Sequence, residues 1–230
     1  MNYLTMFVVS TTTLGAVIGP GTAFAQEAPP PSRLSITPHL GVVSESDFVN
    51  GLVRFSDGDT DFISIEPRTG LLFGVALNYR FQPKVTGVLG LSYTVAGARY
   101  IEKDNFRRDA GISTIRIQPG VMVNVLSAGR SDVSVGGGLT IARIAIDDIV
   151  WNGGRVESSS TAIGLFGAAG IDVPLSGRVS FHAHLALELS KPSYGDLEDG
   201  LARADGEFAS EVDHDLRSAI LLVAGVTFGL

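Results

Sequence analysis

Alternation between bulky apolar residues and smaller or polar residues is the main pattern along this chain. In residues 178–190 the odd positions carry Val, Phe, Ala and Leu, whereas the even positions include His182, His184 and Glu188. Successive side chains of a β-strand point to opposite faces, so a period of two indicates a strand with one apolar and one polar face. Such a strand needs either a core or lipid against its apolar face.

Seven other segments share this period, and each is about long enough to cross a bilayer as a tilted strand. The eight candidate strands are residues 34–43, 71–81, 85–97, 112–125, 133–146, 161–173, 178–190 and 217–230. Short turns rich in Pro, Gly, Ser or Asp alternate with long polar stretches at residues 44–70, 98–110, 147–160 and 191–216. This alternation predicts an all-β fold, an eight-stranded antiparallel up-and-down transmembrane β-barrel with short periplasmic turns and long extracellular loops.

The last strand, residues 217–230, is expected to close this barrel by pairing with the first, residues 34–43. Closure removes the free edge on which such an apolar strand would otherwise aggregate. Apolar side chains then face lipid and polar side chains face the lumen. A slip of one residue would exchange these faces, and each arginine moved onto the lipid face near mid-bilayer costs roughly 2–4 kcal/mol.

The N-terminus has the pattern of a secretory signal. Residues 1–25 form an apolar run that ends in a small-residue site at Ala23 and Ala25, which predicts a cleaved signal peptide. Residues 26–32 include consecutive prolines and are expected to form an extended periplasmic linker. Residues 33–230 then make up the barrel domain, and we expect it in the cell outer membrane.

The amino-acid composition excludes several kinds of site and partner. The chain has no cysteine, so a disulfide framework, a thiolate metal site and lipid attachment through cysteine are excluded. The net charge is −7, and most acidic residues lie in the long polar stretches. Acidic outer loops argue against nucleic acid as a partner.

The signal peptide, the alternating strands, the short inner turns, the long outer loops and a chain end inside the last strand together resemble the small outer-membrane barrels of the OmpA/OmpX type. The resemblance implies insertion by the outer-membrane assembly machinery. Phe228 and Leu230 would then be part of the recognised terminal signal, although such barrels usually end in Phe or Trp rather than in Leu.

The lumen of an eight-stranded barrel is nearly filled by side chains. By phase we expect an inward polar network of His39, Arg80, Arg116, Asp172, His182, His184 and Glu188. Because unpaired buried ions are costly, these residues should form two tiers, with Arg116 and Glu188 in the outer half and Arg80, Asp172 and His182 nearer the periplasm. Two interpretations remain open: a satisfied polar plug, which we favour, and a gate in a narrow conduit.

A metal site at His182 and His184 is a weaker interpretation of the same network. The two side chains share one strand face about 6.6 Å apart. Two nitrogens fall short of a closed site even if Asp172 or His39 contributes. We therefore expect hydrogen bonding in the lumen and no metal or other cofactor.

Basic residues gather near the expected outer rim. Arginine is well suited to phosphate, so these residues are candidate contacts for lipopolysaccharide and outer-membrane lipid: Arg99, Lys103, Arg107, Arg108, Arg143 and Arg217. The alternative is that these side chains bind no particular lipid and only extend their charged ends into water at the membrane interface.

Two of the long outer stretches contain strand-like arms that could protrude. Residues 53–56 and 62–65 alternate around residues 57–61, which fail as a calcium loop because Phe62 and Arg68 replace the required Gly and Glu. Residues 152–153 are Asn-Gly, a strong hairpin signal. A projection carrying Phe55, Phe62 and Trp151 suits an extracellular protein partner that binds by strand addition. Simple long loops are the alternative.

These features indicate a non-enzymatic outer-membrane barrel with a role in envelope integrity and in surface adhesion through protruding acidic loops. A lipid A-modifying barrel enzyme is one alternative, for which His39 with Ser44 or Ser46, or His182 with Ser180, offer a base and a nucleophile by residue type alone. A narrow small-solute channel is the other, because several inward positions are glycine. No Gly-rich phosphate loop, nucleophile elbow or zinc-protease motif is present.

Overall fold

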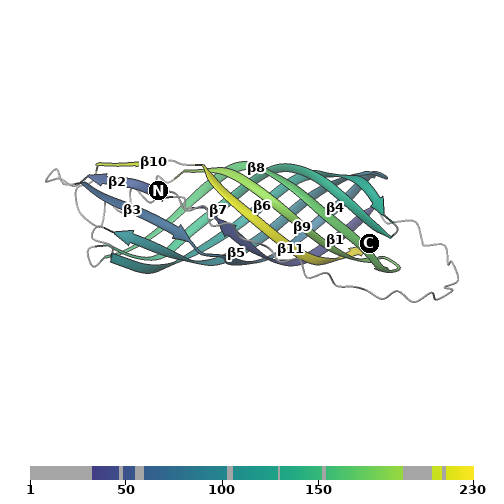
Figure 1. Ribbon diagram of the computed structural model, residues 1–230, viewed down its shortest axis with the longest axis horizontal. Helices are drawn as coiled ribbons and strands as arrows, with labels where there is room; N and C mark the ends of the chain where they lie inside the picture. Colours follow the sequence, from purple (N-terminus) through teal and green to yellow (C-terminus); the bar gives the residue numbers. More distant parts are fainter. Residues whose placement is uncertain are drawn as a thin grey trace.

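The computed structural model of the chain shows an antiparallel β-barrel (Figure 1). It describes residues 33–46, 49–54, 60–102, 106–128, 130–151, 154–193, 209–213 and 216–230. The ring is formed by β1 (Leu34–Glu45), β4 (Gly70–Gln82), β5 (Val85–Glu102), β6 (Phe106–Ala128), β7 (Ser131–Trp151), β8 (Gly154–Ser176), β9 (Val179–Ser193) and β11 (Arg217–Gly229). The expected signal peptide and linker lie outside the described residues.

These eight strands close into a ring. Each pairs antiparallel with the next, and β11 completes the circle by pairing with β1 from Ser35↔Gly229 to Glu45↔Ala219. The predicted fold class and the predicted closing strand are therefore confirmed. No helix long and apolar enough to span a membrane occurs in the described ranges.

The register shows that the strands are tilted. Cα partners followed around the ring from Leu34 return to β1 at Ser44, ten residues further along the same strand. The path passes through Tyr79, Gly87, Val121, Gly137, Gly167, Leu187 and Ile220. A stagger of this kind accompanies a strand tilt of roughly 35–45° in closed barrels. In the order β1, β4, β5 and onward to β11, each step to the next strand therefore moves toward the outer end of the barrel. The rise is about one and a quarter residues per step, because ten residues are spread over eight strands.

The two faces of the sheet differ as the alternation predicts. On β9, Leu187 and Leu189 are exposed on the outer face, whereas Ala186 and Glu188 are buried in the lumen. Large apolar side chains are exposed in the same way on every strand of the ring. An exposed apolar band that surrounds a barrel is the surface that contacts hydrocarbon in a membrane.

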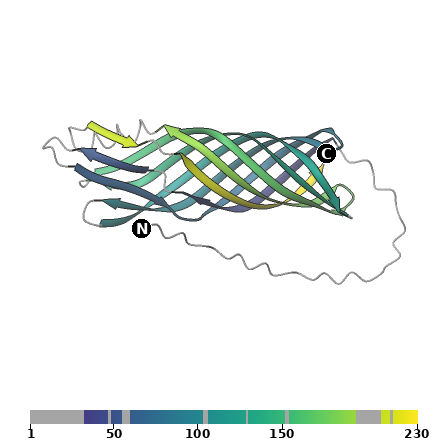
Figure 2. The ribbon, with the colours of Figure 1, turned by 45° about the horizontal axis from the view of Figure 1, so that its top comes forward.

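Three shorter strands continue the barrel wall at the end opposite the C-terminus (Figures 1 and 2). They are β2 (Val49–Arg54), β3 (Thr60–Pro67) and β10 (Ala209–Asp213). β2 and β3 form a hairpin, β3 pairs with β5, and β10 pairs with β2. The predicted strand arms on both sides of residues 57–61 are therefore present, although residues 55–59 themselves lie outside the described part of the chain.

The outer connections are shorter than expected. β5 pairs with β6 up to Glu102↔Phe106, and β7 pairs with β8 up to Trp151↔Gly154. Most of residues 98–110, expected as a loop, is therefore strand, because the backbone ladder continues past the apolar band. The predicted hairpin at residues 152–153 is confirmed by the pairing of its flanking residues.

Glycine is required at two places that define the barrel. Gly177 has φ +50° in the tight turn between β8 and β9, a conformation that side chains disfavour. At Gly164 a Cβ atom would overlap the backbone oxygen of Leu189 on the neighbouring strand. Glycine there allows β8 and β9 to pack closely beside the charged part of the lumen.

The lipid-facing register predicts a depth-dependent cost for charge. Leu185 is 47% exposed midway along β9, and Leu216 is 67% exposed at the outer rim. Leu185→Arg should lower the free energy of unfolding by about 2–4 kcal/mol, whereas Leu216→Arg should lower it by only about 0–1 kcal/mol. Urea unfolding in lipid vesicles measures both values, and equal values for the two variants would contradict this orientation of β9.

Candidate functional site

Four charged side chains meet in the outer half of the lumen, and we call them the outer charge quartet: Glu45, Arg116, Glu188 and Arg217. They come from β1, β6, β9 and β11, and no side chain exposes more than 2% of its surface. Arg116 Nε lies 3.3 Å from Glu188 Oε2. Glu45 Oε1 pairs with Nη2 of Arg116 and with Nη2 of Arg217. Two positive and two negative charges therefore share one dry site.

Neutral side chains add hydrogen bonds to two members of the quartet, Arg116 and Glu188. Arg116 Nη1 donates to Thr94 Oγ1 at 2.6 Å. Glu188 accepts from Thr140 Oγ1 at 3.2 Å, from Gln118 Nε2 at 3.4 Å and from Ser190 Oγ at 3.4 Å. Buried ions persist when they are paired and hydrogen-bonded, and Arg116 and Glu188 have contacts of both kinds. Among the described residues, Glu45 Oε2 has no hydrogen-bond partner.

Arg217 corrects one expectation from the sequence. We expected it at the outer rim among the candidate lipopolysaccharide contacts, but its side chain is fully buried in the lumen beside Glu45. Glu45 was counted among the acids of the outer loop and was not expected in the lumen. The missed signal is phase, because Arg217 has the same parity as the inward residues Ala219, Leu221 and Val223.

A second cluster lies nearer the periplasmic end, and we call it the inner histidine cluster: His39, Asp172, His182 and His184. His182 Nδ1 lies 2.8 Å from Asp172 Oδ1, and its Nε2 lies 3.0 Å from His184 Nδ1. The His39 and His184 rings meet edge to face at 6.2 Å. Arg80, expected here as a partner of Asp172, makes no ion pair with any residue that the structure describes. The described ranges also contain no group of three or more His, Cys, Asp or Glu side chains that could hold a metal ion.

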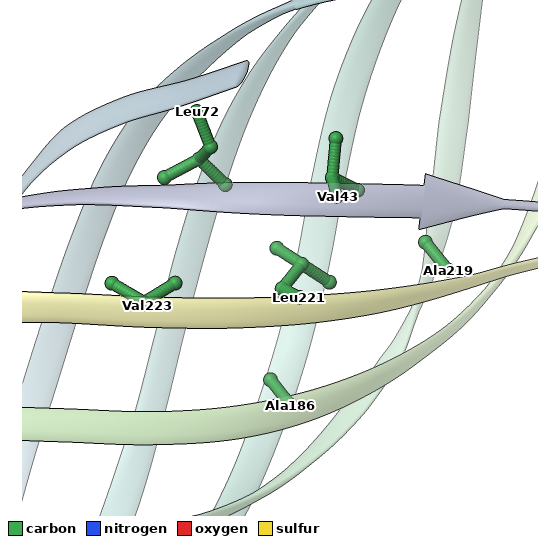
Figure 3. Close-up of a cluster of buried hydrophobic side chains, with 6 residues drawn as sticks. All are labelled: Val43, Leu72, Ala186, Ala219, Leu221 and Val223. Atoms are coloured by element: carbon green, nitrogen blue, oxygen red, sulfur yellow. The ribbon is translucent and has the colours of Figure 1, made fainter. Parts of the chain in front are cut away.

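A cavity of about 80 Å³ lies between the quartet and the inner histidine cluster. Its wall includes Gln118, His39 and His184, but apolar side chains such as Phe166 and Leu221 cover most of it. An apolar cluster drawn from β1, β4, β9 and β11 fills the lumen beside it (Figure 3). Its members are Val43, Leu72, Ala186, Ala219, Leu221 and Val223.

The lumen beyond the quartet is also filled. Ile112, Ile144 and Ile146 are inward residues of β6 and β7 nearer the outer end, and Ile65 joins them from β3. All four are buried, with Ile144 completely inaccessible. Charged and apolar layers therefore succeed one another along the axis of the barrel.

The remaining rim cations have different surroundings. Arg99 lies 3.8 Å from Glu66, and Arg143 Nη2 donates to Ser159 Oγ at 3.5 Å. The side chains of Lys103, Arg107 and Arg108 lie outside the described part of the structure. So do those of Phe55, Phe62 and Trp151, which were expected on the projection.

The terminal residues face outward at the periplasmic end. Phe228 and Leu230 are both exposed, and Leu230 N donates to Leu34 O at 2.9 Å across the β1–β11 junction. This placement leaves their expected role in recognition by the assembly machinery as a prediction.

The closed ring, the external apolar band and the filled interior define an eight-stranded transmembrane β-barrel of the outer-membrane type. The solved structure of outer membrane protein AlkL has a similar fold, with TM-score 0.52 and 14% identity over 91% of this chain and 96% of that one. Outer membrane protein OprG from Pseudomonas aeruginosa is similar too, with TM-score 0.50 and 14% identity over 85% and 96% of the two chains.

No protein-family model and no curated protein matches the sequence. The structural likeness nevertheless shows that the fold is that of a small outer-membrane barrel, as the sequence pattern indicated. It also supports the expected location in the outer membrane.

We predict that a buried ion pair stabilises this protein much more than an exposed ion pair does. Glu188→Ala leaves the site with a net positive charge and should lower the free energy of unfolding by about 3–5 kcal/mol. The matched control is Asp109→Ala, because Asp109 is 79% exposed and pairs with Arg68 at 2.7 Å. That exposed pair should contribute only about 0–1 kcal/mol. Urea unfolding of both variants in vesicles makes the comparison, and similar losses would show that the quartet is not a dry site.

Proposed function

We propose that this protein is a non-enzymatic outer-membrane barrel that contributes to envelope integrity and holds a projecting β-sheet for adhesive contacts outside the cell. The observation that carries the proposal is the combination of a filled lumen with a wall that continues past the apolar band. A filled lumen supports a structural role for the barrel. The projecting strands offer the surface on which a partner can act.

The lumen argues against a solute channel. Any path along the axis has to pass the outer charge quartet and then the buried isoleucines of β3, β6 and β7. Opening it would separate Arg116 from Glu188, and breaking a buried ion pair is costly. The quartet is therefore best interpreted as the polar plug that the sequence favoured.

The candidate catalytic groups also lack an arrangement for chemistry. Ser44 is exposed on the outer face of β1, whereas His39 points inward on the same strand. Ser46 Oγ is 3.0 Å from the backbone N of Ser218, from which it accepts a hydrogen bond. His182 has both ring nitrogens engaged, by Asp172 and His184. A nucleophile and base need mutual hydrogen-bond reach, and these pairs do not provide it.

The projecting sheet supports an adhesive role. Only one side of β10 is paired among the described residues, and its sequence ASEVD carries two acids. An exposed strand edge can accept a further strand from another protein, with main-chain hydrogen bonds supplying affinity. The proposed partner is therefore an extracellular protein that offers an extended segment with basic side chains.

Shortening the projection should separate adhesion from folding. The variant has residues 49–63 replaced by a short turn containing Asn-Gly, which keeps the pairing of Ser64–Pro67 with β5 and the buried Ile65. The variant and the wild type are expressed in cells that lack the protein. Both should keep the shift in electrophoretic mobility on heating that marks a closed barrel. Wild-type cells should bind at least one member of a panel of immobilised extracellular-matrix proteins, and variant cells should lose that binding. Equal binding by the two cell types would contradict the adhesive role.

The two alternatives have direct measurements of their own. Liposomes containing the purified barrel should not swell in small sugars, and single-channel recordings of the wild type and of Glu188→Ala should both remain closed. Mass spectra of lipid A from cells with and without the protein should be identical. Solute uptake would favour the channel, and a gained or lost acyl chain would favour the enzyme.

A further inference from the structure

The rim cations fall into two groups according to their partners. Arg68 and Arg99 are neutralised within the protein, by Asp109 at 2.7 Å and by Glu66 at 3.8 Å. Arg143 and Lys191 are exposed, and among the described residues neither has a carboxylate within ion-pair distance. Among the described residues, an anion at the rim would therefore meet unneutralised cations at Arg143 and Lys191 rather than at Arg68 and Arg99.

Arg143 and Lys191 both belong to the lipid-facing side of the wall. Arg143 on β7 has the parity of the exposed residues Leu139 and Ile141, and Lys191 on β9 has the parity of Leu187 and Leu189. Each is the first charged residue beyond the apolar band on its strand. They thus lie at the boundary between hydrocarbon and headgroups at the outer end of the barrel.

The register places the two cations at nearly the same depth. Arg143 is the partner of Thr161 on β8, and Thr161 is the partner of Ser193 on β9. Two steps around the ring climb about two and a half residues, and Lys191 is two residues below Ser193 on β9. Across the sheet, the backbones at Arg143 and Lys191 are two strand spacings apart, about 9–10 Å. The two-residue offset between Ser193 and Lys191 along β9 adds to this distance. Two long basic side chains can span this distance toward one anionic headgroup.

The surface between and below the cations suits a lipid. Thr161 is exposed between them, and Ser159 Oγ accepts from Arg143 Nη2 at 3.5 Å, so hydroxyl groups lie beside the guanidinium. On the membrane side, the exposed aliphatic residues are Ile141, Ile163, Leu165 and Leu189, with Ile163 and Leu165 each 63% exposed. A cationic pair above an aliphatic surface is complementary to a phosphorylated headgroup above several acyl chains.

We propose that Arg143 and Lys191 bind a phosphate of the acylated, phosphorylated glycolipid of the outer leaflet, lipid A, whose acyl chains lie on Ile141, Ile163, Leu165 and Leu189. Arginine offers two parallel donors to phosphate oxygens, and lysine adds a compact charge. In this proposal the lipid contacts β7, β8 and β9 rather than the whole rim. It includes Lys191, which the sequence analysis did not select, and it does not depend on what the projecting strands bind.

Native mass spectrometry of the purified full-length barrel in detergent tests this site. The probes are bisphosphorylated lipid A, the same lipid after removal of its phosphates, and phosphatidylglycerol. The variant is Arg143→Gln with Lys191→Gln, and the matched control is Arg68→Gln with Arg99→Gln, which also removes two rim cations. The heat-dependent mobility shift verifies that each variant is folded, and all four positions lie outside the lumen.

The double variant at Arg143 and Lys191 should bind bisphosphorylated lipid A at least about tenfold more weakly than the wild type, the effect of losing one or more charge-assisted hydrogen bonds. The control variant should remain within about twofold of the wild type, since its cations are already paired. Dephosphorylated lipid A should bind weakly and equally to all three proteins.

Three outcomes would overturn the proposal. The first is unchanged lipid A binding by the double variant at Arg143 and Lys191. The second is an equal loss in the control at Arg68 and Arg99, which would show that total rim charge matters rather than this site. The third is phosphatidylglycerol binding as tight as lipid A binding, which would point to any anionic phospholipid. Loss of cell adhesion on shortening the projection is measured separately, so the two proposals can fail independently.

Discussion

Lipid offers no hydrogen bonds to a peptide backbone, and this constraint governs the whole structure. The chain meets it by closing eight strands into a ring at the junction of β1 and β11, with a stagger of ten residues between Leu34 and Ser44. Once the ring is closed, the register decides which side chains meet hydrocarbon and which fill the lumen. The external apolar band and the charged interior both follow from that choice.

The outer charge quartet ties the closing junction to the far wall. Glu45 and Arg217 come from the two strands that meet there, and Arg116 reaches Glu45 from β6 across the lumen. Glu188 adds a contact from β9. Because equal numbers of positive and negative side chains are enclosed, their mutual attraction offsets part of the cost of burying four charges. The interior then acts as a structural element, and both proposed functions lie on the outside of the barrel.

The two proposed functions use different regions of the outer surface. Strands β2, β3 and β10 extend the wall beyond the apolar band and offer backbone hydrogen-bonding groups. The lipid-facing side of β7, β8 and β9 instead offers Arg143 and Lys191 above aliphatic side chains. Neither region requires the lumen to open, so a rigid filled barrel suits both.

The sequence alone determined the fold class, the closing strand and the inward face, because a period of two converts directly into two sides of a sheet. His39, Arg116, Asp172, His182, His184 and Glu188 were assigned to the lumen by phase alone. Which of them touch was decided only by the stagger of the closed ring, which brings residues from opposite strands to one depth. Phase alone would also have placed Arg217 in the lumen, but only the stagger brought it to Glu45, left Arg80 without Asp172, and set Lys191 level with Arg143. Phase is a local property of one strand, whereas depth depends on the pairing of all eight.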